Sequence, residues 1–97
     1  MSSVTVEVRI YGALQQRFGR RSAFEPVRTH ATVGSAGTIR DVLASLGLDP
    51  GDVSHLFLNG QYSAASRRVR PGDQLAIFGR DMALLYRQYF PKVADPA

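Results

Sequence analysis

The sequence predicts one α+β domain in which a single main helix crosses a mixed sheet of about four to five strands. Three features lead to this expectation: a strictly alternating first strand, one well-capped helix, and two tight turns that lead into short apolar strands. A chain of 97 residues can bury one thin hydrophobic core. We therefore expect a single domain without a deep substrate cavity.

The N-terminal part of the chain predicts two strands joined by a helical turn. Residues 4–10 alternate apolar and polar side chains, which is typical of a strand with one face in water. Leu14 and Phe18 then stand at the spacing of one helical face, directly before a glycine that ends the turn. A second extended run covers residues 22–33, and Pro26 marks it as an irregular or edge strand.

The segment from Thr38 to Gly47 carries the clearest helix pattern, with apolar residues at helical spacing. Thr38 suits the N-cap, Asp41 the matching position of a capping box, and Gly47 the left-handed residue after the last turn. One face of this helix must pack on the sheet. A short turn follows, with Asp49 as a cap and Pro50 at the first helical position.

Two turns organise the C-terminal half of the sheet. Asn59 and Gly60 predict a type I′ hairpin between a short apolar strand and its return strand. Pro71 and Gly72 predict a type II turn that leads into the last strand, residues 74–78.

Strand alternation also predicts what lies on the face of the sheet opposite the helix. Phe57, Ala76 and Phe78 should share that face. Two exposed phenylalanines form the kind of apolar patch that marks interfaces. Phe57 and Phe78 are therefore candidate protein-interface residues.

The combined pattern resembles the MoaD and ThiS branch of the ubiquitin-like β-grasp family over residues 4–79. The matching segments run from Val4 to Leu14, from Thr38 to Leu43 with Leu46-Gly47, from Leu56 to Gly60 and from Val69 to Phe78. The resemblance implies a ubiquitin-like β-grasp roll whose open sheet face binds partner proteins. Members of this branch are small sulfur carriers for molybdopterin and thiamine synthesis.

The chain departs from those carriers after its last strand. Carriers end in a flexible Gly-Gly whose terminal carboxylate is adenylated and converted to a thiocarboxylate. Here a lone Gly79 is followed by Arg80, and residues 93–97 contain no glycine. We therefore expect the β-grasp domain over residues 1–79 to be a non-catalytic protein-interaction module, linked to molybdenum or tungsten cofactor or sulfur metabolism. A sulfur carrier activated by C-terminal trimming is the first alternative.

The surplus length predicts an amphipathic helix over residues 80–91 and a disordered tail over residues 92–97. Its apolar stripe, also a candidate protein interface, consists of Met82, Leu85, Tyr86, Tyr89 and Phe90. A helix this short needs packing to be ordered. The stripe packs either on its own domain or on a partner, so a partner protein and a homo-oligomer both remain open.

The residue types argue against catalysis, a cofactor and a metal site. The chain has no cysteine, and its two histidines, His30 and His55, lack neighbours at metal-ligand spacing. We expect both histidines at the surface or at strand edges. The sequence contains no nucleophile elbow, carboxylate pair or glycine-rich phosphate loop.

The net charge of +4 comes from an excess of arginine. Arg67, Arg68 and Arg70 flank the last connection and are candidate contacts for an anion or an acidic partner. A second basic group, Arg17, Arg20 and Arg21, flanks the first connection. A nucleic-acid-binding domain is the second alternative, although we do not expect nucleic acid because few aromatic residues accompany the arginines. The absence of a long apolar run predicts a cytoplasmic protein without a membrane partner.

Overall fold

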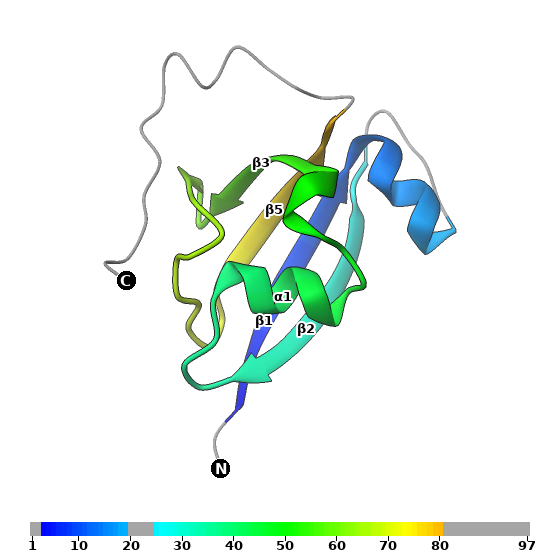
Figure 1. The fold of residues 1–97 in the computed structure, drawn as a ribbon. Helices are drawn as coiled ribbons and strands as arrows, with labels where there is room; N and C mark the ends of the chain where they lie inside the picture. Colours follow the sequence, from blue (N-terminus) through cyan, green and yellow to red (C-terminus); the bar gives the residue numbers. More distant parts are fainter. Residues whose placement is uncertain (1–2, 20–24, 81–97) are drawn as a thin grey trace.

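The fold is taken from a computed structural model that describes residues 3–19 and 25–80. Five strands form one mixed sheet in the order β2-β1-β5-β3-β4 (Figure 1). The strands are β1 (Ser3–Tyr11), β2 (Val27–Gly34), β3 (Val53–Leu58), β4 (Gln61–Tyr62) and β5 (Gln74–Gly79). Strands β1 and β5 run parallel at the centre, and the other neighbouring pairs are antiparallel.

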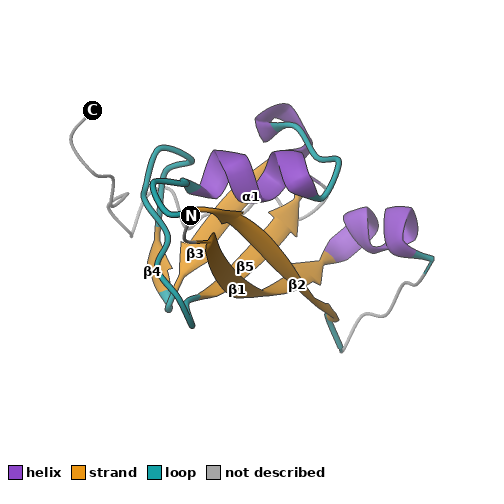
Figure 2. Ribbon diagram, turned by 90° about the horizontal axis from the view of Figure 1, so that it is seen from below, coloured by secondary structure: helices purple, strands orange, loops and turns teal. Residues whose placement is uncertain are grey.

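The helix α1 (Ile39–Ser45) crosses one face of the sheet, as Figure 2 shows. The Thr38 backbone N–H donates to the Asp41 carboxylate at 2.8 Å, so the predicted capping box is confirmed. The apolar face of α1 is fully buried in one core with apolar residues of β1, β2, β3 and β5. Within residues 3–19 and 25–80, no helix covers the opposite face of the sheet (Figure 2).

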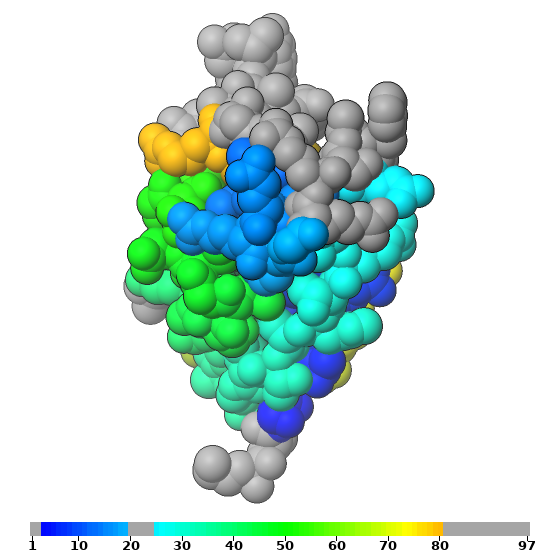
Figure 3. All heavy atoms as spheres, turned by 90° about the vertical axis from the view of Figure 1, so that its right-hand side faces the viewer, coloured from blue at the N-terminus to red at the C-terminus, as the bar shows by residue number. Residues whose placement is uncertain are grey.

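Two short 3₁₀ helices connect the elements, one directly after β1 and one directly before β3. The first, η1 (Gly12–Phe18), buries Leu14 where the sequence predicts a helical turn. In the space-filling view, η1 forms the blue surface between the cyan strand β2 and the green segment around α1 (Figure 3). The second, η2 (Pro50–Asp52), has Asp49 as its cap, as predicted.

The predicted turns are present. Asn59 and Gly60 both have positive φ, 52° and 82°, as a type I′ hairpin requires. The other glycines predicted to end helical turns or form the type II turn also have positive φ: Gly19 (74°), Gly47 (76°) and Gly72 (82°).

The predicted extended run after η1 is an edge strand, because β2 lies at one end of the sheet order. It begins at Val27, directly after Pro26, which cannot donate to a strand ladder. The predicted strand residues 22–24, the helix over residues 81–91 and the tail over residues 92–97 lie outside the described residues. In the described part of the chain, no helix is long and apolar enough to cross a membrane.

Candidate protein-interaction surface

A row of aromatic rings crosses the open face of the sheet. Tyr11 and Phe78 lie opposite each other on β1 and β5, and their rings stack with centroids 4.6 Å apart and planes within 6°. Phe57 on β3 meets Phe78 edge-on at 5.6 Å, and Tyr62 on β4 stacks against Phe57 at 5.5 Å. The predicted sharing of one face by Phe57 and Phe78 is confirmed.

Sequence reasoning missed Tyr11 and Tyr62 as members of this cluster. Tyr11 continues the alternation of β1 on its open face, so the pattern alone could have found it. Tyr62 is found only from the hairpin register, which places it opposite Phe57. The phenylalanines are half-buried rather than fully exposed because these neighbouring rings cover part of their surface.

A shallow groove of about 590 Å³ opens beside the rings. Its lining residues are Arg9, Phe57, Asn59, Gly60, Gln74, Leu75, Ala76 and Phe78. Ala76 lies between Arg9 and Phe57 in the strand register, so its small side chain leaves room there for a partner's side chain. Arg9 forms an ion pair with Glu7 at 3.2 Å, and each side chain keeps 34% of its surface exposed.

His55 departs from the sequence-based expectation. His30 is exposed on the edge strand β2, as expected, but His55 is only 2% exposed. It belongs to β3, which has a neighbouring strand on each side, and its ring packs 5.3 Å from that of Tyr62. Its Nδ1 lies 2.9 Å from the Ser54 hydroxyl. His55 lies two residues before Phe57 on β3, and its side chain therefore points to the same face of the sheet as the aromatic rings. It is buried there despite its polarity.

The three candidate arginines of the last connection come together. Arg67, Arg68 and Arg70 line one small hollow of about 130 Å³, together with Asp73 and Asn59. The structure thus places these residues at one site, where the sequence showed them only as neighbours in the chain.

Backbone hydrogen bonds hold the arginine-bearing loop against the start of α1. The Ile39 N–H donates to the Arg67 carbonyl at 2.9 Å, and the Val69 N–H donates to the Gly37 carbonyl at 3.1 Å. The Val69 side chain is buried in the core. The Arg67 guanidinium donates to the Ser63 hydroxyl at 3.0 Å. The loop therefore presents its arginines from a fixed backbone.

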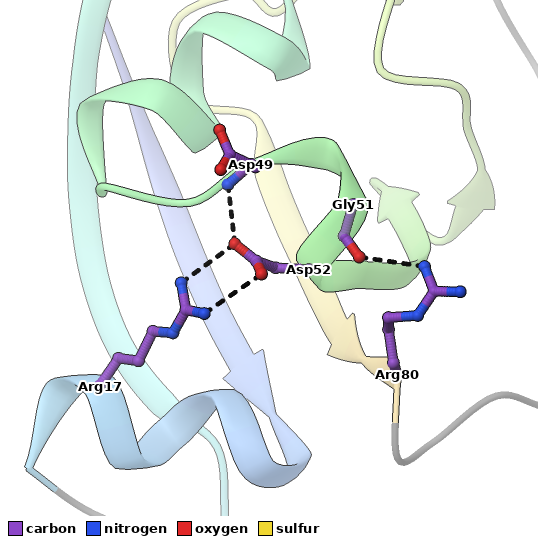
Figure 4. Close-up of polar contacts among 5 residues, drawn as sticks. All are labelled: Arg17, Asp49, Gly51, Asp52 and Arg80. Atoms are coloured by element: carbon purple, nitrogen blue, oxygen red, sulfur yellow. Dashed lines mark hydrogen bonds and ion pairs between the residues drawn. The ribbon is translucent and has the colours of Figure 1, made fainter.

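Arg17 does not join this group. Its guanidinium donates to both carboxylate oxygens of Asp52, at 3.0 and 3.1 Å (Figure 4). The Asp49 backbone N–H also donates to Asp52, at 3.0 Å. These contacts, the Asp49 N–H first and the Arg17 guanidinium second, hold the pKa of Asp52 below its ordinary value of 3.8. Arg17 therefore has a structural partner that joins η1 to η2.

Gly79, which stands where a carrier's tail would begin, is held in the sheet. It lies opposite Val53, and its carbonyl accepts a hydrogen bond from the Ser54 hydroxyl at 2.8 Å. The next residue, Arg80, donates to the Gly51 carbonyl at 3.0 Å (Figure 4). Both residues are part of the folded domain.

The remaining candidates are not placed by the structure. The predicted interface residues Met82, Leu85, Tyr86, Tyr89 and Phe90, and the basic residues Arg20 and Arg21, lie outside the described residues. Within residues 3–19 and 25–80, no three histidine, aspartate or glutamate side chains gather as metal ligands.

A five-stranded mixed sheet with parallel β1 and β5 at its centre, crossed on one face by α1, defines a ubiquitin-like β-grasp domain. The family model described as Mut7-C ubiquitin matches residues 3–84, and the chain belongs to this family. The predicted ubiquitin-like β-grasp fold is thereby confirmed, and a closer relationship with MoaD and ThiS stays a prediction.

One solved structure with a similar fold is the solution structure of the Haloferax volcanii HVO 2177 protein. It is 18% identical, with a TM-score of 0.61 over 79% of this chain and 83% of that chain. At this identity the likeness concerns the fold alone. A search of curated protein sequences finds no match.

Proposed function

We propose that the chain is a non-catalytic, ubiquitin-like protein-interaction module that binds its partner with the open face of its sheet. The observation that carries the proposal is the groove of about 590 Å³ beside the row of aromatic rings. Aromatic residues are enriched at the centres of protein interfaces, because they bury a large area at a small entropic cost. Here Phe57 and Phe78 are half-buried in the free domain and can bury more surface against a partner.

The family name suggests the first partner to test. It couples a ubiquitin-like domain with Mut7-C, so a Mut7-C protein, or a Mut7-C segment of the same polypeptide, is the partner we propose. A second candidate is an enzyme or assembly factor of molybdenum or tungsten cofactor or sulfur metabolism. That candidate is supported by the resemblance of residues 4–79 to MoaD and ThiS.

A carrier function after trimming would need a mobile glycine tail. The position of Gly79 in β5, where Ser54 donates to its carbonyl, argues against a cut that makes this glycine the reacting end. Intact-mass spectrometry of the protein from its native source tests this alternative. A species that ends near Gly79 with a thiocarboxylate would favour the carrier over the interaction module.

Site-specific photo-crosslinking tests the interaction module. A photoreactive residue is placed either at Gln74, exposed at the edge of the groove, or at Ala44, exposed on α1. We expect crosslinks to one defined partner in native cells from position 74 and not from position 44. The same experiment with Phe57→Ala should lose the crosslink while a thermal melt shows that the domain is folded. Crosslinks that come from position 44 alone would refute the open-face proposal.

The predicted stripe beyond Arg80 is tested alongside. Because the proposed interface is the open face of the sheet, we expect Tyr86→Ala to leave the position-74 crosslink intact. Loss of the crosslink in Tyr86→Ala, with Phe57→Ala unaffected, would move the interface to that segment.

A further inference from the structure

The groove and the arginine hollow share one rim. Asn59 lines both of them. Its backbone N–H donates to the Gln74 carbonyl at 2.8 Å, and its side-chain oxygen accepts the Gln74 N–H at 2.9 Å. The side-chain amide donates to Asp73 at 2.9 Å. This rim is therefore fixed, and an extended ligand can pass over it from one depression to the other.

From this continuity, and on the basis of the function proposed above, we propose the chemistry of the partner. The combined surface binds an extended segment of a partner protein that places an apolar side chain in the groove and acidic side chains at the arginine hollow. The groove supplies an apolar contact beside Ala76 and Phe57, and the hollow supplies guanidinium groups.

The charge of the hollow favours a carboxylate ligand. Three arginines face a single acidic residue, Asp73. Both oxygens of that carboxylate already accept hydrogen bonds, one from the Asn59 amide at 2.9 Å and one from the Arg70 backbone N–H at 2.8 Å. The carboxylate of Asp73 therefore stabilises the turn that contains Pro71 and Gly72. Guanidinium groups pair with carboxylates through two parallel hydrogen bonds, which suits aspartate or glutamate on the partner.

A second pair of arginines, Arg9 and Arg28, also favours an acidic ligand. Arg9 lines the groove, and Arg28 lies opposite it on β2. Like charges placed directly opposite on neighbouring strands repel each other, and Glu7 provides an ion pair to Arg9. An acidic ligand across this face would relieve the repulsion. Positive charge therefore flanks the groove from two directions.

The ring geometry favours a peptide over single-stranded nucleic acid. Bases bind by stacking on the free face of an aromatic ring. Tyr11 and Phe78 already stack on each other, at 4.6 Å and 6°, and Phe57 stacks against Tyr62. Each of these rings already has one face against another ring, and Phe57 also meets Phe78 edge-on, so the surface beside them is an apolar groove rather than an open stacking platform.

A random peptide library displayed on phage supplies the probe while the natural partner is unidentified. We expect selection on the purified full chain to enrich peptides that combine an apolar or aromatic residue with aspartate or glutamate. Binding of the selected peptides, followed by fluorescence anisotropy, should weaken about tenfold in Arg70→Gln, further in the double variant Arg68→Gln/Arg70→Gln, and as salt is raised. Arg40→Gln is the matched control, since it removes the same charge from an exposed position on α1.

A groove variant completes the test. Ala76→Leu fills the groove without removing a packed side chain, and we expect it to abolish binding of the same peptides. Selected peptides that lack acidic residues, that are lost in Ala76→Leu and that are unaffected by the arginine variants would overturn this inference and leave the proposed function standing. A failure to enrich any peptide would count against both. Tighter binding of oligouridylate than of any peptide, weakened by the arginine variants, would replace the peptide with single-stranded nucleic acid.

Discussion

The ring of Phe78 lies face to face on that of Tyr11, 4.6 Å away and 6° from parallel, and so joins the central parallel strands on their open side. The contact connects the first strand to the last described one on the side of the sheet away from the core.

This stack should contribute measurably to stability. In a double-mutant cycle of Tyr11→Ala and Phe78→Ala, we expect a coupling of about 0.5–1.5 kcal/mol in the free energy of unfolding, the range of aromatic pairs. Urea denaturation provides the four free energies. The effects of Tyr11→Ala and Tyr62→Ala, by comparison, should add to within about 0.5 kcal/mol. Additive effects for Tyr11 and Phe78 would mean that the stack is unimportant for folding.

The Arg17–Asp52 pair predicts a stability that depends on acidity. Because the pKa of Asp52 is lowered in the folded protein, its contribution is present above the ordinary value of 3.8 and is lost as the pH falls through the folded pKa. We expect Asp52→Asn to be less stable than the wild type near pH 7, and the difference to shrink by about pH 2. Urea denaturation at both pH values measures this. A difference that persists unchanged at low pH would point to lost packing rather than charge.

Two glycines before α1 should respond very differently to the same change. A methyl group at Gly37 would lie 2.6 Å from Val33 Cγ2 and 2.9 Å from the Gly34 carbonyl oxygen, closer than atoms can pack. At Gly34 it would meet no atom within 4 Å. We expect Gly37→Ala to lower the melting temperature and Gly34→Ala to leave it nearly unchanged. Equal melting temperatures for the two variants would show that the backbone adjusts at little cost.

The glycine of the hairpin turn tests the effect of backbone conformation, whereas Gly37 tests the effect of steric space. Gly60 has φ of 82° with open surroundings, whereas Gly51, equally open, has no positive φ. Gly60→Ala should therefore cost about 1–2 kcal/mol in the free energy of unfolding, and Gly51→Ala much less. Chemical denaturation distinguishes them. A larger loss at Gly51 would contradict the turn assignment.

The sequence was most informative where chemistry is local. The Thr38 cap with Asp41 and the Asn59-Gly60 turn each depend on a few neighbouring residues, and strand alternation placed Phe57 and Phe78 correctly. These patterns predict the structure well because the residues that form each of them lie within one cap, turn or strand.

The features that could not be predicted from the sequence depend on contacts between residues far apart in the chain. The burial of His55 and the partner of Tyr11 follow from strand order, which no local pattern encodes. The gathering of Arg67, Arg68 and Arg70 around one hollow depends on how their loop is held against α1. The groove itself required the register that places Ala76 beside Phe57.

The position of β5 at the centre of the sheet also has a consequence during synthesis. Strand β2 is the next strand after β1 along the chain, whereas β5, the parallel neighbour of β1, is the last described strand to leave the ribosome. Until residues 74–79 emerge, one edge of β1 has no hydrogen-bonding neighbour. The core beneath α1 also lacks the apolar side chains of β5 until then. We therefore expect nascent chains arrested before β5 to be sensitive to protease, and the finished domain to fold in one late step governed by a long-range pairing.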